Sequence, residues 1–105
     1  MSVVRDTRRS ESSKATVEVK VPGRMQGFVG KVKSVQAVGG TIREVLADLD
    51  ARYPGGHDYL FAEDGKLQRF VGIYLNGQDI RSLKGLETRV KDGDSVAIVL
   101  AIGGG

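Results

Sequence analysis

Hydrophobic residues alternate strictly with polar ones near the start of the chain. In the run ATVEVKV, Val17, Val19 and Val21 share one face, and threonine, glutamate and lysine side chains share the other. This pattern predicts a half-buried β-strand. A second run, KVKSVQAV, falls out of the period at Val32 and Val35. The two runs together predict a hairpin, with a β-bulge as one way to absorb the change of phase.

The hydrophobic period changes to that of a helix in TIREVLADLDARY. Thr41 stands three residues before Glu44, the capping-box spacing that satisfies free amide groups at the start of a helix. The apolar positions recur at helical spacing and form a single stripe: Ile42, Val45, Leu46, Leu49 and Tyr53. The following PGG ends the helix, because proline breaks the hydrogen-bond ladder and glycine adopts the backbone angles of a stop.

A further alternating region, LQRFVGIYLNG, predicts a strand closed by a tight NG turn. The segment before it, HDYLFAEDGK, is predicted to be a loop. Alternation directs three residues of the strand toward the core: Val71, Ile73 and Leu75. Phe70 and Tyr74 are therefore expected on the opposite face, with Gly72 between them.

The last apolar run, SVAIVLAI, follows a DGD turn and predicts the final strand. Its core positions are Val96, Ile98 and Leu100. Ala97 and Val99 consequently face outward, beside the positions expected for Phe70 and Tyr74. The sequence ends with three glycines: Gly103, Gly104 and Gly105.

The order of elements predicts an α+β fold in which one mixed sheet of four to five strands packs across one main helix. Strand, strand, helix, strand, strand is the order of the β-grasp (ubiquitin-like) fold, whose first and last strands are parallel neighbours at the centre of the sheet. We expect a flexible, basic, serine-rich leader over residues 1–14, a β-grasp domain over 15–102 and a flexible glycine tail over 103–105.

Composition narrows the classes of function. The chain of 105 residues is long enough for one domain, and no apolar run approaches the roughly 20 residues that span a bilayer. The absence of cysteine excludes disulfides and thiolate metal sites. Residues 1–14 hold four basic and two acidic side chains, so two of the three net positive charges lie there. We therefore expect a nearly neutral body, a cytoplasmic location, no membrane contact and no nucleic-acid partner.

The helix, KLQRFVGIYLNGQDIR, VKDGDSVAIVLAI and the closing glycines together resemble the ubiquitin-like sulfur carriers of the MoaD/ThiS family. The middle strand most resembles the branch that serves cysteine synthesis. The resemblance implies that a ubiquitin-activating-like adenylyltransferase uses ATP to join AMP to the carboxyl group of Gly105. A sulfur donor then displaces AMP and leaves a thiocarboxylate, from which a downstream sulfur-transfer enzyme takes the sulfur for cysteine, molybdopterin, thiamin or a similar product.

The same resemblance implies that the chain is a protein co-substrate and not itself an enzyme, with no bound cofactor or metal. The activating enzyme needs a surface to hold, and alternation predicts one from apolar residues that face away from the core: Phe70, Tyr74, Ala97 and Val99. The alternative is that the loop over residues 54–66 folds over these side chains and buries them.

Other classes of function stay open at this point. Gly105 could be joined to lysines of target proteins, which would make the chain a ubiquitin-like modifier. A β-grasp binding module would instead lose function with residues 1–14 and tolerate the loss of Gly105. Catalysis by this chain is disfavoured, because its one histidine, His57, has no candidate nucleophile or metal-ligand partner at a recognisable spacing.

Overall fold

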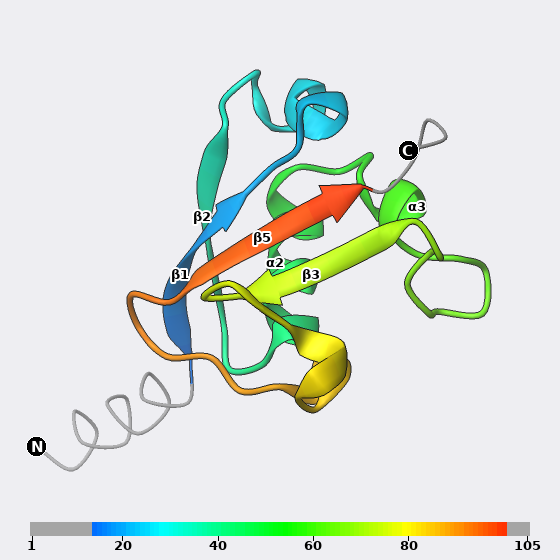
Figure 1. The fold of residues 1–105 in the computed structure, drawn as a ribbon. Helices are drawn as coiled ribbons and strands as arrows, with labels where there is room; N and C mark the ends of the chain where they lie inside the picture. Colours follow the sequence, from blue (N-terminus) through cyan, green and yellow to red (C-terminus); the bar gives the residue numbers. More distant parts are fainter. Residues whose placement is uncertain (1–13, 101–105) are drawn as a thin grey trace, which may run out of the picture.

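The computed structural model describes residues 14–100, in which a five-stranded mixed sheet packs against one main helix (Figure 1). Its elements in chain order are β1 (Ala15–Lys20), η1 (Gly23–Val29), β2 (Ser34–Gly39), α2 (Ile42–Arg52), α3 (His57–Leu60), β3 (Val71–Leu75), β4 (Gln78–Asp79), η2 (Ile80–Ser82), η3 (Gly85–Glu87) and β5 (Ser95–Leu100). The η elements are 3-10 helices.

The strand order across the sheet is β2-β1-β5-β3-β4. β1 and β5 are parallel neighbours, and the other adjacent pairs are antiparallel. The predicted β-grasp arrangement is confirmed, with five strands. The predicted leader, apart from Lys14, and the tail residues Gly103, Gly104 and Gly105 lie outside the described residues.

The first hairpin follows the predicted alternation without the predicted bulge. Val17 and Val19 are buried, whereas the alternate residues of β1 are exposed: Thr16, Glu18 and Lys20. β1 and β2 pair without a break from Ala15 opposite Gly39 to Lys20 opposite Ser34. The predicted hairpin is therefore confirmed, and the bulge that was one option within it is absent from this pairing. Residue 32 precedes the strand, so its phase has no bearing on the pairing.

The predicted capping box at the start of α2 forms with one partner shifted, because the Glu44 carboxylate bonds to the residue before the cap residue Thr41. The Thr41 hydroxyl accepts a hydrogen bond from the Glu44 N–H at 3.3 Å, and the Glu44 carboxylate accepts one from the Gly40 N–H at 2.7 Å. The predicted apolar stripe faces the sheet, with four residues buried and the last partly buried: Ile42, Val45, Leu46, Leu49 and Tyr53. Burial of each aliphatic side chain stabilises the fold by about 1.5–3 kcal/mol.

Helix α2 sits directly on the end of β2. A Cβ atom built on Gly39 would lie 2.7 Å from the Val45 nitrogen and 2.8 Å from the Glu44 carbonyl carbon. One turn further along, the Asp48 carboxylate accepts a hydrogen bond from the Val38 N–H at 2.9 Å. Backbone atoms of the helix thus occupy the space that a side chain at position 39 would need.

Gly39→Ala is expected to lower the free energy of unfolding by about 1–3 kcal/mol or more, because the new methyl group meets backbone atoms that cannot rotate away. Urea denaturation measures the change. Gly23→Ala is the matched control, since a Cβ there meets no atom within 4 Å. Equal destabilisation by the two substitutions would contradict the close approach of α2 to β2.

Two expectations for the middle of the chain need correction. Residues 57–60 form the short helix α3, although a loop was expected. The predicted strand from residue 67 begins only at Val71, because the Val71 N–H donates to the Gln68 carbonyl at 3.0 Å and closes a turn. Phe70 therefore lies in that turn, outside the alternating region.

The predicted NG turn joins β3 to β4 and also ties both to β5. Asn76 and Gly77 have φ values of 52° and 87°, as a two-residue hairpin requires. The Asn76 side-chain oxygen accepts from the Ser95 N–H at 2.9 Å, and its nitrogen donates to the Asp94 carboxylate at 3.1 Å. One side chain thus joins the turn to the start of the last strand.

Asn76→Ala is expected to lower the free energy of unfolding by about 1–3 kcal/mol, because it removes two hydrogen bonds and places alanine in a left-handed conformation. Asn76→Gly separates the two effects, since glycine keeps the turn conformation and loses only the side-chain bonds. We expect about 1 kcal/mol for Asn76→Gly. A glycine variant as stable as the native protein would show that these bonds contribute nothing.

Candidate functional site

The sheet face opposite α2 brings together three of the four predicted docking residues. Tyr74 on β3 is paired with Ala97 on β5, and Gly72 is paired with Val99 one step along the same strands. Val99 is 45% exposed, whereas Tyr74 and Ala97 are half-buried. We call Tyr74, Ala97 and Val99 the docking face, after the role that the sequence predicts for them.

Gly72 gives the Tyr74 ring its position on the docking face. A Cβ atom on Gly72 would lie 3.3 Å from Cε1 of Tyr74 and 3.9 Å from the Val99 carbonyl oxygen. The ring therefore lies along β3 over the glycine. An aromatic ring against aliphatic neighbours is a frequent anchor of protein interfaces.

Phe70 does not join the docking face. It precedes β3, and its ring packs edge-on against Tyr59 of α3, with centroids 6.1 Å apart and planes at 85°. The segment over residues 54–66 thus reaches Phe70, as the alternative expected, while Val99 on the face remains exposed. The alternation used to orient Phe70 does not apply to a residue in a turn.

Lys20 is a neighbour of the docking face that sequence reasoning did not include. It is exposed and lies opposite Ala97 in the parallel pairing of β1 with β5. Strict alternation already put Lys20 on the outer face of β1. Its position beside Ala97 follows only from the order of strands in the sheet. The sequence therefore indicated which way Lys20 faces but not which residues it adjoins.

The central strand β5 leads toward the C-terminus between two neighbours. β1 pairs with it from Ser95 to Ala97, and β3 pairs with it from Val96 to Leu100 (Figure 1). The described chain ends there. The predicted modification site, Gly105, lies five residues further on and outside the described residues.

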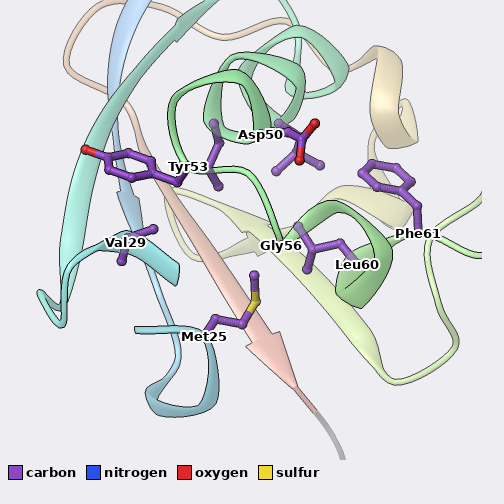
Figure 2. Close-up of a pocket in the computed structure, with 9 residues that line it drawn as sticks. Met25, Val29, Asp50, Tyr53, Gly56, Leu60 and Phe61 are labelled. Atoms are coloured by element: carbon purple, nitrogen blue, oxygen red, sulfur yellow. The ribbon is translucent and has the colours of Figure 1, made fainter. Parts of the chain in front are cut away.

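The interior offers no room for a small-molecule ligand at the crevice between η1, α2 and α3. Figure 2 shows Met25 of η1 pointing toward Gly56 and Leu60 across this apolar crevice. The cavity volume is about 10 Å³, which accommodates no more than about one water molecule. The crevice is a packing gap in the core.

The charged groups of residues 14–100 lie mainly at the surface. Three ion pairs join exposed or half-exposed side chains: Arg43 with Glu87, Arg52 with Asp48, and Arg81 with Asp79. Hydrogen bonds from the Arg81 side chain and backbone hold the pKa of Asp79 below its ordinary value. Within this range no cluster of His, Cys, Asp or Glu could hold a metal ion, and no helix is long and apolar enough to cross a membrane.

Residues 19–105 match the model of the ThiS family. This chain belongs to the ThiS family. The match covers most of the chain and confirms the resemblance to MoaD/ThiS proteins that the strand and turn motifs predicted.

Three relatives illustrate how far the likeness of this ThiS-family chain extends. "Sulfur carrier protein CysO" of Mycobacterium tuberculosis (strain ATCC 25618 / H37Rv) is 44% identical over 91 residues, which cover 85% of this chain and 98% of the relative. The crystal structure of the Amycolatopsis orientalis BexX/CysO complex contains a chain that is 40% identical, with a TM-score of 0.79. That match covers 85% of this chain and 99% of the other.

The third relative is the solution structure of small archaeal modifier protein 1 from Methanosarcina acetivorans. It is 31% identical, with a TM-score of 0.76 over 88% of this chain and 98% of that chain. The ThiS-family chain therefore has the fold shared by proteins named as sulfur carriers and by proteins named as modifiers.

Proposed function

We propose that the chain is a sulfur carrier that acts through the C-terminal carboxylate of Gly105. The supporting observation is the 44% identity to a protein named as a sulfur carrier, over 98% of that relative's length. The family match also extends through Gly105. By analogy with the MoaD/ThiS carriers, and with the branch serving cysteine synthesis in particular, the sulfur would be delivered to a biosynthetic pathway in the cytoplasm.

The chemistry begins with activation, because a carboxylate is a poor electrophile. A partner adenylyltransferase transfers AMP from ATP to the Gly105 carboxylate and releases pyrophosphate. Hydrosulfide then attacks the acyl carbon, AMP leaves and a thiocarboxylate remains. A downstream sulfur-transfer enzyme uses that nucleophilic sulfur. The chain is the co-substrate of both enzymes, and ATP binds to the first of them.

Glycine suits a terminus that must enter another protein's active site. Without a Cβ, it can pass through a narrow channel and adopt angles closed to other residues. Three extended residues reach about 10 Å, at 3.3–3.6 Å each. Ordering them costs about 1–2 kcal/mol per residue, and contacts made by Tyr74, Ala97 and Val99 with the activating enzyme would offset that cost.

The direct test of activation uses the full chain, its adenylyltransferase from the same cells and ATP. The proposal predicts one pyrophosphate released per chain without a sulfur source, because the acyl adenylate accumulates. Addition of hydrosulfide should then release one AMP per chain and leave the thiocarboxylate. If ATP consumption does not depend on the chain, the proposed activation is wrong.

A second candidate function is that of a ubiquitin-like modifier, in which a target lysine attacks the same adenylate or a thioester formed from it. The likeness to small archaeal modifier protein 1 favours keeping this candidate. The two functions share their first step and differ in the final nucleophile. Mass spectrometry of proteins linked to Gly105 through a lysine side chain would identify the modifier function.

A further inference from the structure

A groove with a volume of about 460 Å³ runs along the outer edge of β3. It lies between the segment 65–69 on one side and η2 with η3 on the other. Its volume is within the range of about 300–1,000 Å³ typical of ligand sites. Partly buried apolar side chains contribute to its lining: Leu67, Val71 and Leu86.

The backbone of β3 is open toward this groove. β4 pairs only with Tyr74 and Leu75, so the ladder on this side stops before Ile73. The Asn76 N–H donates to the carbonyl of Ser95, the first residue of β5, at 2.8 Å. Because backbone groups alternate in direction along an antiparallel strand, those of Tyr74 and Gly72 also point to β5. The backbone groups of Val71 and Ile73 therefore point away from β5. The pairing of Tyr74 with Asp79 sets the Ile80 N–H opposite the Ile73 C=O, so the Ile73 N–H and the Val71 C=O are the groups directed to the groove. No turn or loop bond among residues 14–100 uses either of these two groups.

The rim of the groove is positively charged. Arg43, Lys66, Arg69 and Arg81 line it. Arg43 and Arg81 are paired with carboxylates, whereas Lys66 and Arg69 form no ion pair with an acidic residue in the described part of the chain. Two uncompensated cations thus stand beside a free strand edge.

We propose that this groove binds an extended acidic segment of a partner protein. The segment adds a short strand to β3 through the Ile73 N–H and the Val71 C=O. Its apolar side chains contact Val71 and Leu86, and its carboxylates lie beside Lys66 and Arg69. A free phosphate would use the cations but neither the strand edge nor the apolar lining. The proposal does not depend on the chemistry of the C-terminus, so either can fail without the other.

The test is a titration of the ¹⁵N-labelled full chain with the peptide acetyl-Glu-Val-Glu-Val-Glu-amide, followed by NMR. We expect shifts confined to residues 65–73 and to the facing residues of η2 and η3, with slower hydrogen exchange of the Ile73 amide. The double variant Lys66→Glu/Arg69→Glu should weaken binding about tenfold or more. Lys33→Glu, an exposed charge reversal outside the groove, should leave it unchanged.

Several results would overturn the proposal. The first is an absence of shifts at Ile73. The second is binding of equal strength by a lysine-valine peptide, or by a peptide with a central proline. The third is a loss of binding in Lys33→Glu as large as that in the double variant. The same shifts with inorganic phosphate or with oligouridine would assign the groove to an anion or to RNA. If no shifts occur, Lys66 and Arg69 would instead serve to prevent the open edge of β3 from pairing with another copy of the chain.

Discussion

Deletion of Gly105 is expected to lower the rate of C-terminal adenylation by about 100-fold or more. Loss of one extended residue draws the reactive carboxylate back by about 3.3–3.6 Å, and a displacement of about 1 Å in an active site can already cost 100-fold. Gly104 would then carry the carboxylate, so the reacting group is preserved and only its reach changes. Chain-dependent pyrophosphate release by the activating enzyme is the measurement.

The matched control for this deletion is removal of residues 2–13, which lie at the other end of the sequence. We expect pyrophosphate release by this variant to stay within about twofold of the native rate, since surface changes away from a contact site have small effects. The reverse pattern, in which the leader is required and Gly105 is not, would favour a binding module over a carrier.

Val99→Asp is expected to lower the same rate by about 100-fold when the chain is well below saturation. The substitution buries an unpaired carboxylate in an apolar contact, and truncation of an interface anchor commonly costs 2 kcal/mol or more. Val99 is chosen over Phe70, because the contact of Phe70 with Tyr59 would confuse loss of docking with loss of stability.

Val32→Asp is the control for the docking face. Val32 is 44% exposed and Val99 is 45% exposed, so the two side chains are equally accessible. Val32 lies outside the docking face. Both variants should remain folded, which thermal denaturation would check. Equal rates for the two variants, or unfolding of Val99→Asp alone, would contradict the assignment of Val99 to an interface.

The spacing of hydrophobic residues predicted the fold, because most of the sheet and α2 bury the residues that this spacing indicates. Val17, Val19, Ile73, Val96 and Ile98 are all buried at the positions where alternation put them. The apolar stripe at helical spacing likewise predicted which residues of α2 are buried. The order of these elements then left few arrangements, because one helix and one sheet must cover each other's apolar face.

Short elements escaped prediction because tertiary contacts stabilise them. Residue 25 of η1 and residue 60 of α3 are buried against the core, but neither helix is long enough to display a period. Phe70 was misplaced for a similar reason. The turn ends at Phe70 and β3 begins at Val71. Both residues are apolar, so the sequence did not mark where the strand begins.

The sites depend on segments that the sequence does not connect. Lys20 adjoins the docking face only because β1 and β5 are parallel neighbours. The groove beside β3 combines the start of α2, the segment 65–69 and the two short helices after β4. The sequence predicted which residues face outward along each strand, and only the topology showed which of them meet.

The central claim is that Gly105 carries sulfur, and the intact mass of the protein purified from its own cells tests it most directly. The mass is measured before and after treatment with an alkylating reagent that reacts with thiocarboxylates. Because the chain has no cysteine, alkylation at sulfur reports the terminus without competition from thiols. We predict a species with one oxygen replaced by sulfur, and one alkyl group added at Gly105. A plain carboxylate alone, even after incubation with the activating enzyme, ATP and hydrosulfide, would contradict the carrier function.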